Sequence, residues 1–382
     1  MKTIDEKKLK ENIRKRAEAD FRCGKIGGAA FFVRQRNQTL CYDFYGYKTA
    51  DRKSVLSEDC LFRLASMTKP IVTIAIMREV EKGNLSLFDK VETFLPEFAD
   101  MSIGKVENGK VVITGKAKNS LRILHLLTHT SGLDCGELGD FLKNSISEKD
   151  NCNLDSAVLY YAKNPLAFEP YTQSQYSGTV AFDVLLRILE IVSGKTAQEY
   201  FQSEIFLPLK MTDTTFEPSP EQWDRLVEMH DYQNGASTFV KMKENCIFED
   251  IPVTHRCGGA GLISSLGDYA RFATMLLNGG ELDGVRILQK NTVRSFSKAH
   301  IPESLISCNN WSLGMRVIEY DDYDPLASGS YGWSGSYGTH FWVDPVNKVA
   351  AVYMKNSMYE GGAGARTAVN FEKDVFDSYK EK

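Results

Sequence analysis

A serine and a lysine three residues apart, directly before an apolar segment, constrain this chain more than any other feature. Ser66 and Lys69 lie in residues 64–70, and the apolar residues 71–77 follow. A helix brings side chains three residues apart onto one face, and the proline at position 70 is tolerated only in a first turn. The pattern predicts a buried helix that begins at this pair.

A serine at the start of a buried helix lies next to free backbone N–H groups, which suits a nucleophile whose product is an oxyanion. Lys69, buried beside it, is a candidate to accept the proton of Ser66. Ser-x-x-Lys is a weak pattern alone, since it also occurs at residues 102–105 and 295–298. Those two copies lack a following buried helix, so context favours Ser66.

Composition excludes several classes of function. The net charge of −4 gives no electrostatic footprint for nucleic acid, so none is expected as a partner. No stretch approaches the length of a membrane span, so no membrane partner is expected. Residues 1–21 are charged throughout and lack the apolar core of a signal peptide, which predicts a cytoplasmic protein.

The eight cysteines are scattered and include no Cys-x-x-Cys pair. In a reducing compartment they are expected to be buried thiols, and neither a disulfide, a metal site nor another cofactor is predicted. They are Cys23, Cys41, Cys60, Cys135, Cys152, Cys246, Cys257 and Cys308.

Strand patterns occur at both ends of the chain. Residues 29–33 and 38–47 form an expected hairpin, and residues 311–320, 335–343 and 349–355 an expected antiparallel meander. Helical patterns fill most of the sequence between them. The prediction is an α/β fold of the α+β type, with a central antiparallel sheet built from both chain ends and flanked by helices.

The same pattern predicts two domains. Residues 1–75 and 251–382 would form a discontinuous α/β domain, and residues 76–250 a mostly helical inserted domain. An active site is expected at their junction.

A His-Thr-Ser-Gly turn at residues 129–132 raises the alternative of a catalytic histidine. The favoured interpretation is that His129 and Thr130 hold a loop by hydrogen bonds.

Residues 66–69 resemble the first motif of the serine β-lactamase and penicillin-binding-protein superfamily. Residues 126–133, 258–272 and 338–345 resemble stretches of its class C branch, which includes the family VIII type of carboxylesterases and transesterases. The order of these stretches is the order of the family, and the resemblance extends over about residues 20–360. It implies a β-lactamase/transpeptidase-like fold.

The second motif of that family is a tyrosine, any residue and an asparagine. The literal match at residues 232–234 lies in a polar stretch with no helix after it. Residues 176–178 are the better match, since they precede a helical pattern, so the resemblance assigns Tyr176 as a catalytic residue. Gly178 would line the substrate site, where the family has an asparagine amide.

The third motif aligns with Trp333, Ser334 and Gly335, which are expected to line the substrate site. Tryptophan replaces the cation of the family's motif, as in the esterase branch. By the same alignment, the backbone N–H groups of Ser66 and Ser336 would form the oxyanion hole.

The resemblance implies a serine hydrolase that forms an acyl-enzyme on Ser66, with Lys69 and Tyr176 sharing the proton. Small uncharged esters are the expected substrates, for hydrolysis or transesterification, because a carboxylate beside Trp333 would lose its water without a charged partner. The alternatives are a class C-type β-lactamase or D-alanyl peptidase, which would bind a β-lactam-like substrate, and a catalytically silent binding protein of the same fold. The sequence leaves the oligomeric state open.

Overall fold

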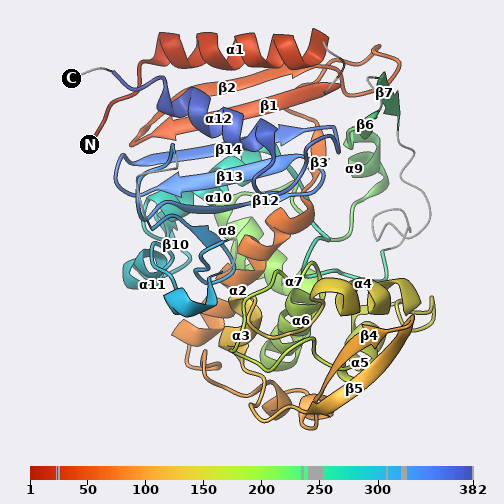
Figure 1. The fold of residues 1–382 in the computed structure, drawn as a ribbon. Helices are drawn as coiled ribbons and strands as arrows, with labels where there is room; N and C mark the ends of the chain where they lie inside the picture. The colour runs from red at the N-terminus through yellow and green to blue at the C-terminus, as the bar shows by residue number, and fades with distance from the viewer. Residues whose placement is uncertain are drawn as a thin grey trace.

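A six-stranded antiparallel sheet forms the centre of the molecule (Figure 1). The computed structural model describes residues 1–22, 24, 26–233, 236–239, 253–306, 309–319 and 325–380. The strand order is β11-β12-β13-β14-β1-β2, and β1 pairs antiparallel with β14, so both chain ends build one sheet, as predicted. The strands are β1 (Gly28–Gln35), β2 (Gln38–Gly46), β11 (Arg316–Val317), β12 (Tyr331–Gly335), β13 (Thr339–Asp344) and β14 (Val349–Lys355).

Helices cover both faces of this sheet (Figure 1). Helices α1 (Glu6–Arg22) and α12 (Arg366–Phe376) lie on one face, and α10 (Leu266–Leu277) packs against β13 and β14 on the other. Side chains alternate between faces along a strand. Phe31 accordingly joins the core under α1 and α12, whereas Phe32 joins the larger core that contains α10.

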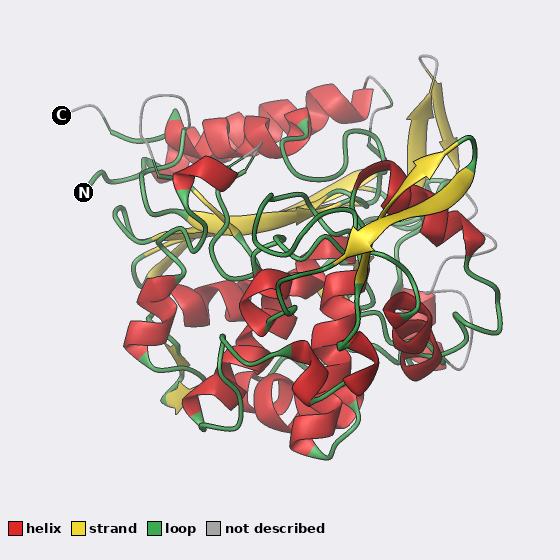
Figure 2. Ribbon diagram, turned by 60° about the horizontal axis from the view of Figure 1, so that its bottom comes forward, coloured by secondary structure: helices red, strands yellow, loops and turns green. Residues whose placement is uncertain are grey.

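Most of the remaining helices lie in the middle of the chain and gather beside the sheet (Figure 2). They are α2 (Thr68–Glu81), α3 (Ile123–Leu127), α4 (Gly136–Ser145), α5 (Leu154–Ala162), α6 (Val180–Ser193), α7 (Ala197–Phe201), α8 (Leu207–Leu209), α9 (Pro220–Arg225) and, later, α11 (Lys290–Ser295). Short 3₁₀ or π turns are η1 (Ala65–Met67), η2 (Val91–Thr93), η3 (Pro96–Phe98), η4 (Gln202–Phe206) and η5 (Glu303–Leu305).

The predicted helical middle also contains two hairpins that the sequence patterns did not indicate. They pair β4 (Ser102–Glu107) with β5 (Lys110–Lys116), and β6 (His230–Gln233) with β7 (Ala236–Phe239). The other two-stranded pairs are β3 (Leu61–Arg63) with β8 (Ile263–Ser265), and β9 (Glu281–Leu282) with β10 (Val285–Arg286). The division into domains at residues 75 and 250 stays a prediction.

Two predicted strands near the C-terminus were wrong in extent. Of residues 311–319, the described part of the expected strand 311–320, only Arg316 and Val317 enter the six-stranded sheet. The expected strand 335–343 contains a turn at residues 336–338, where Gly338 adopts φ 92°. The apolar alternation continues on both sides of this turn, so periodicity alone could not locate it.

In the described part of the chain, no helix is long and apolar enough to cross a membrane.

Candidate active site

Ser66 lies where the chain enters the buried helix α2. It belongs to the 3₁₀ turn η1, which continues directly into α2, and it is half-buried between two fully buried neighbours. Ala65 adopts φ 47°, a left-handed conformation that costs a non-glycine residue about 1–3 kcal/mol. Such strain is typical of residues that a functional site holds in place.

Lys69 points from the first turn of α2 back to Ser66. Its Nζ lies 3.2 Å from Ser66 Oγ, and it also donates to the carbonyl oxygens of Gly178 and Gly259, at 2.5 and 2.8 Å. The side chain is completely buried. All three of these partners are neutral oxygens, and together they fix the amine against the serine.

Tyr176 approaches Ser66 from the loop before α6. Its hydroxyl lies 2.8 Å from Ser66 Oγ. The indole N–H of Trp333 donates to the same hydroxyl oxygen at 3.2 Å. Two groups that can exchange protons, Tyr176 and Lys69, therefore contact one serine oxygen. The rejected match, Tyr232, lies on β6, and its side chain is outside the described residues.

Aromatic rings pack around Tyr176 and hold it in place. Trp311 is stacked on it with ring centroids 5.8 Å apart and an interplanar angle of 12°, and Trp333 lies 5.2 Å away. Trp311 is fully buried. No sequence motif indicates its contribution, since Trp311 lies 135 residues from Tyr176 along the chain.

His129 supports the tyrosine from behind. Its ring centroid is 4.7 Å from that of Tyr176, and its Nδ1 accepts a hydrogen bond from the backbone N–H of Ser177 at 3.1 Å. Complete burial, reinforced by the charge of Lys69, holds the pKa of His129 well below its usual value. A neutral histidine that holds a loop agrees with the favoured interpretation of this turn.

The glycines at 258–259 let a loop come close enough to bind Lys69. A Cβ at Gly258 would lie 2.2 Å from the carbonyl oxygen of Phe182, and one at Gly259 would lie 2.5 Å from the backbone of Thr179. The carboxylate of Asp183 accepts from the Gly258 N–H at 2.7 Å. This arrangement orients the Gly259 carbonyl toward the amine.

The third motif lies at the buried C-terminal end of β12, beside η1. A Cβ at Gly335 would lie only 2.1 Å from the carbonyl oxygen of Leu64, so the strand and the turn that carries Ser66 are in close backbone contact. Ser336 follows directly. In the described part of the chain, neither the Ser66 nor the Ser336 backbone N–H donates to another protein group.

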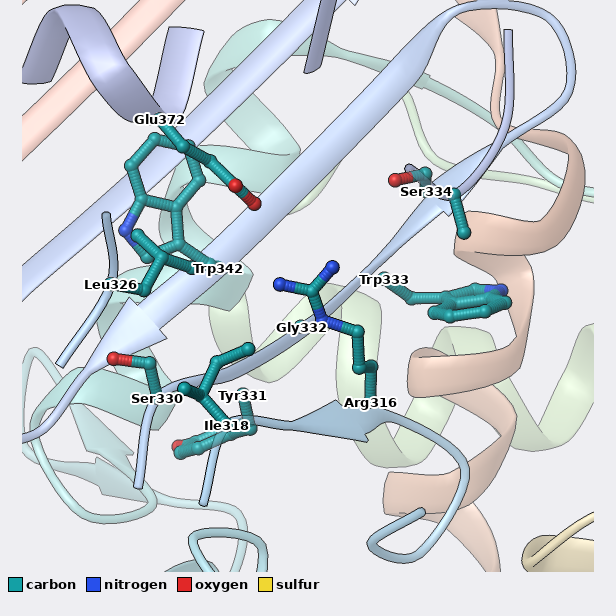
Figure 3. Close-up of a pocket in the computed structure, with 11 residues that line it drawn as sticks. Arg316, Ile318, Leu326, Ser330, Tyr331, Gly332, Trp333, Ser334, Trp342 and Glu372 are labelled. Atoms are coloured by element: carbon teal, nitrogen blue, oxygen red, sulfur yellow. The ribbon is translucent and has the colours of Figure 1, made fainter. Parts of the chain in front are cut away.

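The side chains of the third motif point to opposite faces of β12. Trp333 faces Tyr176, whereas the Ser334 hydroxyl lies on the face toward α12 and bonds to His340. Ser334 is thus directed away from Ser66, unlike a direct substrate ligand. Arg316 from β11 lines a small pocket with Trp333 and Ser334 (Figure 3). Ile318, Trp342 and Glu372 line the same pocket, so it lies on the face of β12 toward α12 and away from Ser66.

The contacts of Ser66, Lys69 and Tyr176 given above include no cysteine side chain. Among the described residues, no group of three or more His, Cys, Asp or Glu side chains could hold a metal ion. Cys41, Cys60, Cys135 and Cys257 are free and buried, and Cys152 is free and exposed. Cys23, Cys246 and Cys308 lie outside the described residues.

A family model described as Beta-lactamase matches residues 10–372. The chain belongs to the Beta-lactamase family. This membership confirms the resemblance and makes the protein a serine hydrolase of the β-lactamase fold.

Individual relatives carry several names. "Esterase EstB" of Burkholderia gladioli is 28% identical over 90% of this chain and 89% of its own length. A "Putative D-alanyl-D-alanine carboxypeptidase" of Salmonella typhimurium is 27% identical over 87% of this chain and 79% of its own. The solved structure of "EstCE1, a hydrolase with promiscuous acyltransferase activity" superimposes with a TM-score of 0.83, at 22% identity over 97% of this chain and 99% of that one.

Proposed function

We propose that this protein hydrolyses, or transfers the acyl group of, small uncharged esters through an acyl-enzyme on Ser66. One observation carries the proposal: the Tyr176 hydroxyl and the Lys69 amine converge on Ser66 Oγ at 2.8 and 3.2 Å. A serine hydroxyl is a weak nucleophile until an adjacent base takes its proton. The names of EstB and EstCE1 support the ester class.

In the first half-reaction, Ser66 Oγ attacks the acyl carbon and its proton passes to the Lys69–Tyr176 pair. The carbonyl oxygen becomes an oxyanion, which the unused N–H groups of Ser66 and Ser336 would bind. An oxyanion donor contributes about 3–4 kcal/mol to catalysis. The pair then returns the proton to the departing alcohol as the ester C–O bond breaks.

In the second half-reaction, water or another alcohol attacks the acyl-enzyme. The Lys69–Tyr176 pair takes the proton of the attacking molecule, and the released Ser66 oxygen regains one. The same groups therefore act as base and then as acid in each half.

Acylation of Ser66 is the direct test. Incubation with an activated ester or a fluorophosphonate probe should produce one adduct, which mass spectrometry locates on the peptide that contains Ser66. Ser66→Ala should abolish both the adduct and the esterase activity. An adduct on Ser102 or Ser295 would contradict the assignment, and the absence of any adduct would favour a silent binding protein.

The name of the Salmonella typhimurium relative favours a second candidate function. β-Lactams and peptidoglycan peptides carry a carboxylate near the scissile bond, and a D-alanyl peptidase of this fold would need a cation to pair with it. Turnover of p-nitrophenyl esters far above that of a chromogenic cephalosporin would support the ester proposal. The reverse order would support a β-lactamase or D-alanyl peptidase.

A further inference from the structure

A chain of three buried polar side chains runs behind the third motif. The Ser334 hydroxyl lies 2.8 Å from His340 Nδ1, and His340 Nε2 lies 2.9 Å from Glu372 Oε1. Ser334 and His340 are cross-strand neighbours on β12 and β13, and Glu372 comes from α12. The proposed chemistry at Ser66 uses none of these three side chains.

The trio has the composition of a Ser-His-carboxylate triad, but its surroundings exclude an acyl substrate. All three residues are buried, with 3–6% of their surface exposed. The adjoining pocket, shown in Figure 3, offers about 20 Å³, which is room for about one water molecule. Ser334 therefore has no space in which to attack an ester.

The trio instead connects α12 to the neighbouring strands β13 and β12. A buried ionised carboxylate costs several kcal/mol unless it is paired. Glu372 is paired by accepting the Nε2–H of His340, which leaves Nδ1 to accept the hydroxyl proton of Ser334. Glu372 on α12 thus determines which nitrogen of His340 on β13 carries the proton. That tautomer in turn makes Ser334 on β12 the donor to Nδ1.

The residues on either side of Ser334 explain why its position matters. Trp333 donates to the Tyr176 hydroxyl, and Gly335 lies in backbone contact with the turn that carries Ser66. We propose that His340 and Glu372 are positioning residues of the active site, which act through Ser334 to hold the end of β12 against Ser66 and Tyr176. This inference rests on the proposed hydrolase function.

A matched pair of variants at Ser334 isolates the hydrogen bond. Ser334→Thr and Ser334→Val introduce β-branched side chains of nearly equal size, and only threonine keeps the hydroxyl. The lost hydrogen bond should make kcat of the valine variant roughly threefold to tenfold lower than that of the threonine variant. KM for a p-nitrophenyl ester should stay nearly the same, because the strand positions groups that act in the transition state.

Substitutions at Glu372 extend the test to α12. Glu372→Met removes the acceptor and should lower kcat as Ser334→Val does. Glu372→Gln should keep most of the wild-type kcat, because the amide oxygen can still accept a hydrogen bond from the His340 Nε2–H. In the double variant of Ser334→Val and Glu372→Met, the two losses should be clearly less than additive.

Asp374→Asn is the control for a loss of stability alone. Asp374 is also a buried carboxylate on α12, but it pairs with Arg16. This variant should lower the melting temperature and leave kcat unchanged. Equal kcat for the valine and threonine variants would overturn the inference. An equal loss of kcat in Asp374→Asn would also overturn it. Labelling of Ser66 would still support the hydrolase proposal in either case. A fluorophosphonate adduct on Ser334 in Ser66→Ala would overturn the inference as well, since Ser334 would then be a nucleophile.

Discussion

At the scale of single residues, Tyr176 shows how far a motif can be trusted. The family pattern and the helix that follows predicted its place, and the structure puts its hydroxyl beside Ser66. The supporting side chains were not predictable in the same way. Trp311 and Glu372 reach their partners only through contacts between distant segments, for which a single sequence gives no signal.

Loss of the Tyr176 hydroxyl should remove most of the general acid–base catalysis. Tyr176→Phe keeps the ring that stacks on Trp311, so the fold should survive. We expect kcat for a p-nitrophenyl ester to fall by about 10²–10⁴, the usual range for this type of catalysis. Tyr232→Phe on β6 is the matched control and should have little effect. A large loss in Tyr232→Phe, with none in Tyr176→Phe, would reverse the choice of motif.

At the scale of elements, the buried helix was predicted well and the strand ends were not. Residues 71–77 are apolar on every side, so they belong inside the protein in any arrangement, and α2 forms there. A strand end depends on its turn. The turn at residues 336–338 was missed because apolar side chains continue on both sides of it. That turn places the Ser336 N–H, so the least predictable element bears on the proposed oxyanion hole.

Gly335 allows β12 and η1 to approach each other at this turn. Gly335→Ala would place a Cβ 2.1 Å from the Leu64 carbonyl oxygen, which forces strand and turn apart. We expect kcat/KM to fall by at least tenfold and the melting temperature to drop. The loss in kcat/KM is expected because a shift of the Ser336 N–H weakens binding of the transition state. One oxyanion donor contributes about 3–4 kcal/mol to catalysis.

Gly115→Ala serves as the comparison, because a Cβ at this exposed position on β5 would meet nothing within 4 Å. It should leave both the kinetics and the melting temperature near wild-type values. Full activity in Gly335→Ala would show that the close approach is not needed.

At the scale of the whole molecule, the joining of both chain ends into one sheet followed from where the strand patterns lie. Pairing of β1 with β14 was the simplest way to bury the apolar faces of both, and it is what forms. The polar contacts that connect the sheet's helices to the middle of the chain were not predictable. Asp268, on α10, accepts hydrogen bonds from the Asp213 N–H and the Thr214 hydroxyl, each at 2.8 Å.

This connection should make stability depend on pH. Burial raises the pKa of Asp268 from 3.8 to about 6. The folded protein then binds this proton more tightly than the unfolded chain does, so the contribution of Asp268 to the free energy of unfolding falls as the pH rises from 3.8 through about 6. A shift of about two pKa units corresponds to up to about 3 kcal/mol.

Asp268→Asn removes the ionisable carboxyl group. The decrease in unfolding free energy that Asp268 causes as the pH rises should therefore be absent from the variant. Urea unfolding of the variant and the wild type at several pH values between about 4 and 7 would measure it. The difference in unfolding free energy should move in favour of the variant as the pH rises, whatever constant offset the altered hydrogen bonds add. A flat difference for Asp268→Asn would mean that the bonds to residues 213 and 214 compensate fully for burial, and that this junction holds its carboxylate at no cost at neutral pH.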